Sequence, residues 1–126
     1  MSDNKLKTYV SPNKAIVSAL SPILPIAHLQ YEGTANTYAI FRIVNRIVSV
    51  IGSGRNKVVD CYIYIDVFSP DDLSRADSII GDIENALLEA GFIVRDIADV
   101  RFTPDGSPEA YHHTEIDCVL TMEVPA

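Results

Sequence analysis

The clearest pattern in the chain lies between Val58 and Gly91, where a segment with alternating residues leads directly into a segment with helical spacing. Strict alternation of apolar with more polar residues is typical of a strand that buries one face. The apolar side consists of Val59, Cys61, Ile63, Ile65 and Val67, and the other side of Asp60, Tyr62, Tyr64, Asp66 and Phe68. We therefore expect a strand from 58 to 68 in the middle of a sheet.

The next segment predicts a helix over 70–90 with recognisable signals at both ends. Ser69 can cap the helix, Pro70 suits its first position, and Gly91 can end it. Apolar residues recur every three or four positions, which predicts one buried face. That face consists of Leu73, Ala76, Ile80, Ile83 and Leu87. We expect it to lie on the sheet.

Upstream, the same combination of a cap residue and a proline predicts a first helix. Ser11 and Pro12 begin it, and Pro22 prevents it from continuing. A short extended segment follows at 26–31. Residues 1–10 are polar, and we expect them to form a flexible N-terminal arm.

A long β-hairpin is predicted next. Residues 38–51 are rich in β-branched and aromatic side chains, and GSGRN at 52–56 provides the turn into the strand from 58. Alternation predicts Arg42 and Arg46 on one side of the first strand. On the other side it predicts Phe41, Ile43 and Ile47. The tip should project beyond the body of the domain.

Two further strands complete the chain. The first follows Gly91 and is expected to be broken around Ala98 and Asp99, and the second alternates through 112–124 after turn-forming residues. The order of elements predicts an α+β fold, with a mostly antiparallel sheet, two helices packed on it and a long β-hairpin. Its 126 residues are expected to form a single domain.

Composition narrows the classes of partner. A net charge of −7, with ten scattered basic residues, argues against direct binding to nucleic acid, which needs clustered Lys and Arg. The start of the chain lacks the apolar core of a signal peptide, and no apolar stretch reaches the length of a membrane span, so we expect synthesis in the cytoplasm and no membrane partner. The two cysteines, Cys61 and Cys118, are expected to be buried free thiols.

Three features suggest chemistry, but each has a simpler explanation. His112 and His113 are adjacent, so on a strand they point to opposite faces and cannot share a metal ion. The glycines of the turn at 52–56 join two strands, whereas phosphate-binding loops lead from a strand into a helix. Asp60 and Asp66 lie about 20 Å apart along one strand, too far to act as a catalytic pair. We expect no catalytic residues, no cofactor and no metal.

The order of these segments resembles that of the tail-completion or tail-terminator proteins of long-tailed bacteriophages. Four stretches carry the resemblance: HLQYEGTANTYAIFRI at 28–43, YIYIDVFSPDD at 62–72, EAGFIVRD at 89–96 and YHHTEIDCVL at 111–120. The matching positions are Asp66, Phe68, Ser69, Gly91, Phe92, Tyr111 and His112. None of them forms a reactive motif, so order and spacing make the resemblance. The hairpin is longer and more apolar than the family pattern.

The resemblance implies a structural protein of the virion. Such a protein assembles as a ring, typically a hexamer, on the head-proximal end of the tail tube, stops tube polymerisation and contacts a neck or head-completion protein. DNA would only pass through the ring, and an acidic wall would keep the duplex from adhering. We expect residues 48–57 to reach a neighbouring subunit or the tube. The expected interface residues are Arg46, Ser53, Gly54, Arg55, Asn56, Lys57, Asp60, Tyr62 and Tyr64.

Two other functions fit the same sequence. A head-closure or connector adaptor of the neck would also form rings without chemistry. A small-ligand-binding α+β domain would use the face bearing Tyr62, Tyr64 and Asp60 as a pocket. A concave site would favour ligand binding, whereas a flat exposed face would favour assembly.

Overall fold

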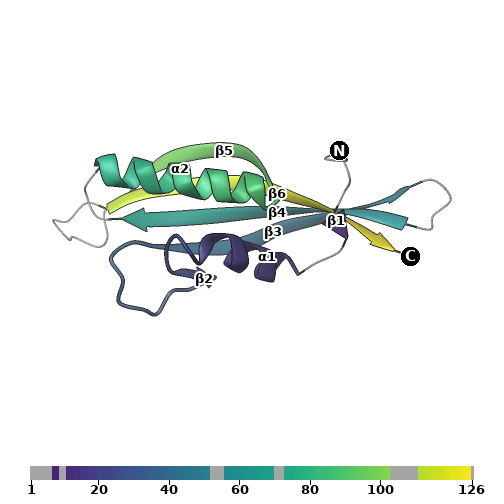
Figure 1. Cartoon of the computed structure of the whole chain (residues 1–126), viewed down its shortest axis with the longest axis horizontal. Helices are drawn as coiled ribbons and strands as arrows, with labels where there is room; N and C mark the ends of the chain where they lie inside the picture. Colours follow the sequence, from purple (N-terminus) through teal and green to yellow (C-terminus); the bar gives the residue numbers. More distant parts are fainter. Residues whose placement is uncertain (1–6, 9–10, 52–55, 70–72, 103–110, 126) are drawn as a thin grey trace.

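A computed structural model describes residues 7–8, 11–51, 56–69, 73–102 and 111–125, which form one sheet and two helices (Figure 1). The elements are β1 (Lys7–Thr8), α1 (Pro12–Leu20), β2 (Ile26–His28), β3 (Tyr38–Ile51), β4 (Asn56–Ser69), α2 (Leu73–Glu89), β5 (Ile93–Phe102) and β6 (Tyr111–Pro125). The predicted α+β class is confirmed.

The sheet is built around the predicted hairpin. β3 and β4 pair antiparallel along their whole length, from Tyr38 opposite Phe68 to Ile51 opposite Asn56. β6 pairs antiparallel with the other side of β4. The far side of β6 is shared by β5, which is antiparallel, and β1, which is parallel. β2 pairs parallel with the start of β3.

The two-residue strand β1 was not expected. Lys7 and Thr8 pair with Met122 and Glu123 of β6, so this part of the N-terminal segment that was expected to be flexible belongs to the sheet. The rest of that N-terminal segment lies outside the described residues. The turn at 52–55 lies there too, and β4 begins at Asn56, which was expected to belong to that turn.

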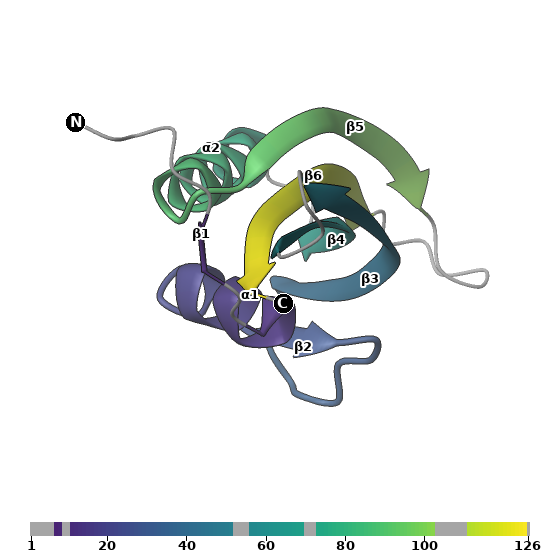
Figure 2. The same ribbon diagram turned by 90° about the vertical axis from the view of Figure 1, so that its right-hand side faces the viewer.

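Both helices lie on the same side of the sheet, as Figure 2 shows. α1 begins as predicted, because the side chain of Ser11 accepts a hydrogen bond from the backbone N–H of Lys14 and a proline occupies the first turn. Ile16 and Leu20 of α1 are fully buried. Among the described helices, none is long and apolar enough to cross a membrane.

The end of α2 is also as predicted, whereas its predicted start at Pro70 lies outside the described residues. Gly91 has a φ of 93°, a conformation that glycine adopts without strain. The N–H of Gly91 donates to the carbonyl of Leu88, and that of Phe92 donates to the carbonyl of Leu87. This pair of bonds closes the helix and turns the chain into β5.

The core fills the space between the helices and one face of the sheet. The core residues of β4 and β6 lie on the face that alternation predicted, and Ile83 and Leu87 of α2 cover them. On the sheet this core comprises Ala39, Phe41, Cys61, Ile63, Ile65, Val67, Ile116, Cys118, Leu120 and Met122. We call this the helix face and the opposite side the open face.

A bulge in β3 overturns one prediction. The register shifts between Ile43 and Asn45, so Val44 is an extra residue in the strand. Because side chains alternate with a period of two, one extra residue moves every later side chain to the other face. Arg46 therefore lies opposite Cys61 on the helix face, and Ile47 lies opposite Asp60 on the open face. The prediction that Arg42 and Arg46 share a side is wrong.

The predicted break in the strand after Gly91 is also in the wrong place. β5 continues through Ala98 and Asp99, and its irregularity falls between Val94 and Asp96. Pairing with β6 along most of its length compensates for the weak strand propensity of Ala and Asp.

Candidate functional site

The structure separates the residues predicted to form an interface. Asp60, Tyr62 and Tyr64 lie together on the open face of β4, as their alternation predicted. Arg46 lies on the helix face instead, for the reason given above. Lys57 is exposed near the start of β4. Ser53, Gly54 and Arg55 lie outside the described residues, and the backbone of Asn56 pairs with Ile51 and Pro125.

Tyr64 belongs to a charged cluster on the open face. The guanidinium of Arg42 lies over the Tyr64 ring, 5.0 Å from its centre, and donates to the carboxylate of Asp66 at 2.9 Å. Nε2 of His113 also lies 2.9 Å from Asp66, while Glu115 is 3.8 Å from Arg42. Asp66 is 8% exposed, so two partners balance a carboxylate that is nearly out of water.

Tyr62 and Asp60 repeat this arrangement further along β4. Arg95 lies over the ring of Tyr62 at 5.0 Å and 3.5 Å from the carboxylate of Asp117. Asp60 accepts a hydrogen bond of 2.7 Å from the hydroxyl of Thr121. Each of these three predicted residues is therefore in contact with a side chain from another strand of the sheet.

Aromatic rings extend the open face toward one end. Tyr31 stacks on Tyr38, Tyr38 on Phe68, and Phe68 on His113, with ring centres 4.4, 5.2 and 4.5 Å apart. The stack crosses β3, β4 and β6, and it also holds the loop after β2 against the sheet.

The open face is therefore a network of cross-strand contacts. The arginines cover both tyrosine rings, which makes the predicted ligand pocket on this face a poor fit. Sequence reasoning missed five of the partners, namely Arg42, Arg95, His113, Glu115 and Asp117. Alternation in the last strand separates His113, Glu115 and Asp117 from the buried residues, but only pairing with β4 shows what they contact.

A second feature is the part of the sheet that continues past both helices (Figure 1). We call this part the arm. It consists of the second half of β3, the first half of β4 and the end of β6. Its side chains in β3 include large apolar residues on both faces. Val44 is 50% exposed, Ile47 45% and Val48 55%.

The arm also has an unpaired backbone edge. β2 pairs with β3 only at Ala39, Ile40 and Phe41, and no other described strand lies on that side of β3. Residues 42–51 therefore form a free edge, with backbone donors and acceptors available to another strand. In the described part of the chain, the side of β5 away from β6 is the other long edge without a partner strand.

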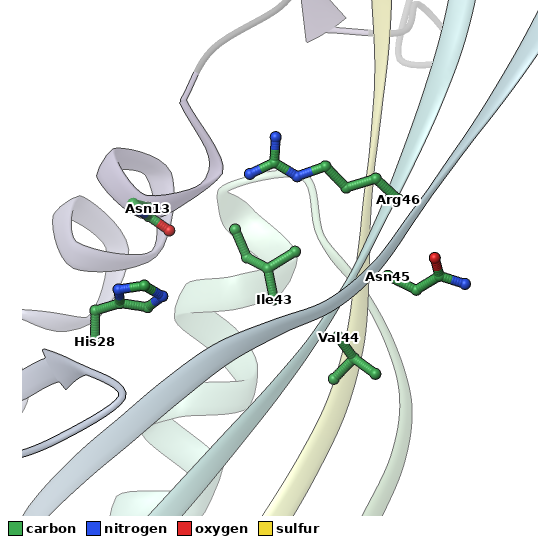
Figure 3. Close-up of a pocket in the computed structure, with 6 residues that line it drawn as sticks. All are labelled: Asn13, His28, Ile43, Val44, Asn45 and Arg46. Atoms are coloured by element: carbon green, nitrogen blue, oxygen red, sulfur yellow. The ribbon is translucent and has the colours of Figure 1, made fainter.

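A hollow of about 400 Å³ lies where β2 ends and this free edge begins. Figure 3 shows Asn13 of α1 and His28 of β2 facing Ile43 and Arg46 across it, while Val44 and Asn45 point to the other side of β3. Oδ1 of Asn13 is buried and has no hydrogen-bond partner among the described residues. Arg46 likewise forms no ion pair with a described residue. The hollow thus offers a guanidinium and an amide beside the free edge.

Neither cysteine is suited to nucleophilic chemistry. Both are free and buried in the core, as predicted. Burial raises the pKa of the Cys118 thiol to about 12. Burial also raises the pKa of Cys61, although Arg46 acts in the opposite direction. In the described ranges, no group of three or more His, Cys, Asp and Glu side chains could hold a metal ion.

Comparison with models of known protein families and with curated proteins finds no match for this chain.

Proposed function

We propose that the chain is a structural virion protein, a tail terminator that forms a ring at the head-proximal end of a phage tail tube. The identity of the assembly rests on the order of sequence segments described above. The observation that carries the assembly role is the arm, which exposes Val44, Ile47 and Val48 beside a free strand edge.

Such an arm has no use in an isolated chain. A long edge strand with exposed apolar residues is a template for pairing with another chain, and soluble monomers normally block such edges with charges, prolines or cover. Here the 42–51 edge carries two charged residues, Arg42 and Arg46, and Arg42 is held by Asp66. An assembly would cover the exposed side chains and satisfy the backbone.

The open face fits a role in which shape matters more than reaction. Its charges are paired between strands, so they hold β3, β4, β5 and β6 in one relative arrangement. A ring component needs a fixed curvature, and cross-strand pairs are a means of fixing it. A net charge of −7 further suits a ring through which DNA slides without adhering.

The test combines light scattering over a concentration series with negative-stain images after purified tail tubes are added. Rings, or caps on one end of the tubes, are the expected result. Deleting Ser53–Asn56 should abolish assembly, because these residues belong to the expected interface, and it should leave the monomer folded, because the described core lies elsewhere. A shortened protein that still caps tubes would remove the turn from the interface.

The neck adaptor makes a different prediction in the same experiment. An adaptor would form rings and travel with heads, and it would ignore tubes. Rings that bind purified heads and not tubes would therefore replace the tail terminator by the adaptor.

A further inference from the structure

The free edge of β3 and the free edge of β5 carry different charged side chains. The edge of β3 at 42–51 carries arginines and no acidic residue, whereas β5 carries two exposed carboxylates, Asp96 and Asp99, together with Arg95 and Arg101. Each edge belongs to a strand of ten or more residues. We propose that the free edge of β3 pairs antiparallel with β5 of a second copy of this chain, with Arg46 opposite the second copy's Asp99.

The topology sets the direction of this pairing. β3 and β6 run antiparallel to β4, and β5 runs antiparallel to β6, so β3 and β5 point in opposite directions within one sheet. When copies are arranged around an axis that runs along the strands, β3 of one copy and β5 of the next copy also run in opposite directions. Antiparallel pairing is the more stable arrangement per residue.

The register follows from the faces of the two strands. Asp99 lies opposite Thr114 and Ile97 opposite Ile116, so both are on the helix face, as are Arg46 and Val48. Placing Arg46 opposite Asp99 therefore places Val48 opposite Ile97. This register joins the Arg46 guanidinium, which has no ion-pair partner among the described residues, to a carboxylate. It also covers Val48, which is 55% exposed, with another apolar side chain.

Pairing of β3 with β3 of a second copy is the less favourable alternative. It would be symmetric about a two-fold axis and would join two edges whose only charged residues are the arginines Arg42 and Arg46. It would also leave both copies of β5 unpaired and could produce only a dimer. A contact between two different edges repeats from copy to copy and can close into a ring.

The proposed register also has a geometry that a closed ring can accommodate. Within one copy, Asp99 pairs with Thr114, Thr114 with Val67, and Val67 with Ala39. Asp99 and Ala39 therefore lie at the same height along the strands. In the proposed contact, Asp99 lies opposite Arg46 of the other copy. Arg46 is six residues beyond Ala39 if the extra residue of the bulge is not counted, so adjacent copies would be shifted by about 20 Å along the strands. The four strands β3, β4, β6 and β5 of one copy span roughly 19 Å across the sheet. A shift of similar size along the strands corresponds to a tilt of about 45° from the ring axis, at the upper end of the tilts found in closed barrels.

A disulfide experiment tests the pairing directly. Val48→Cys and Ile97→Cys variants are mixed under mild oxidation, with a tag on one so that the three possible dimers differ in mass. Because both native thiols are buried and hold their protons, they should react much more slowly than the introduced cysteines. The expected product links position 48 of one copy to position 97 of the other, and mass spectrometry of the joined peptides identifies it.

Two controls make the result decisive. Asp96→Cys replaces Ile97→Cys in the first, and no link to position 48 is expected because Asp96 lies on the open face opposite Asp117. In the second, Val48→Cys is oxidised alone, and a dimer there would show pairing of β3 with itself. That dimer, or no link between positions 48 and 97 at high protein concentration, would overturn the proposal.

Charge exchange gives an independent readout. Arg46→Asp or Asp99→Arg alone should raise the concentration needed for self-association roughly tenfold, and the double variant should restore it. Leu88→Lys is the matched control for Val48→Lys, because Leu88 is 53% exposed on α2. Only Val48→Lys should block association. Circular dichroism checks that each variant is folded.

The inference deepens the ring-forming part of the proposed function, but its test needs no tubes. Copies that link in the proposed register and ignore tubes would keep the pairing and refute the tail terminator. Chains that cap tubes without this link would keep the tail terminator and refute the proposed pairing.

Discussion

The two halves of β3 are alike in sequence and different in environment. In the half beside β2, Ala39 and Phe41 are 0% and 1% exposed under the helices. In the half that belongs to the arm, Ile47 and Val48 are about half exposed, although they are equally apolar. The first half is apolar because the monomer needs a core. The second half is apolar without contributing to that core, which supports the proposed contact with another chain.

The largest expected difference between the halves is in stability. Phe41→Ala should lower the free energy of unfolding by about 3–5 kcal/mol, because it leaves a cavity in the core. Ile47→Ala should cost less than about 1 kcal/mol, since the side chain is already largely in water. Urea denaturation of both variants measures the contrast. Equal losses would mean that the arm packs within the monomer.

The carboxylates of the open face extend the comparison with a smaller effect. Asp66, in the body, has two charged or polar partners and is nearly buried, so Asp66→Ala should cost about 2 kcal/mol. Asp60, opposite Ile47 in the arm, has one described hydrogen-bond partner, Thr121, and Asp60→Ala should cost about 1 kcal/mol or less.

Thermal unfolding at neutral pH measures both carboxylate variants. Asp66→Asn serves as the control, because it keeps the shape and one acceptor oxygen. A greater loss for Asp60→Ala than for Asp66→Ala would place the stabilising network in the arm.

The thiols give the smallest contrast, in reactivity. Cys118 pairs with Ile63 in the body, and Cys61 lies opposite Arg46 at the base of the arm. Because the pKa of Cys118 reaches about 12, whereas Arg46 partly opposes the rise for Cys61, Cys61 should react first with a thiol reagent. Faster labelling of Cys118 would contradict the expected order of thiol reactivity.

The same shifts fix the direction of a pH effect. The ordinary pKa of the thiol is 9.0 and the fold raises it. Above about pH 9 the unfolded chain releases these protons while the folded protein keeps them. The free energy of unfolding should therefore fall as pH rises from 9 toward 12. In Cys118→Ala, urea denaturation across this pH range should show a shallower fall.

Local sequence predicted most of the body. The alternation in β4 and β6 marks the buried face correctly, and the signals at Ser11 and Gly91 mark a helix start and a helix end. These features depend on residues within a few positions of one another. The tip residues Ser53, Gly54 and Arg55 stay predictions, as they lie outside the described residues.

What sequence reasoning missed depends on pairing between distant strands. Nothing near Val44 marks it as an extra residue, since valine is as good a strand former as its neighbours. Arg95 and Asp117 contact across β5 and β6, and only the register of those strands brings them together. The side-chain partners of the open face and the edges of the sheet are properties of topology, which alternation within one strand does not contain.

The bulge at Val44 has a consequence for how this protein could change over time. Removing that one residue would restore unbroken alternation and exchange the two faces of the outer part of β3, while leaving Ala39 and Phe41 in place. Arg46 would then share a face with Arg42, away from the hollow. A single codon thus separates two versions of the edge, which would present different side chains to a partner strand while Ala39 and Phe41 keep their places.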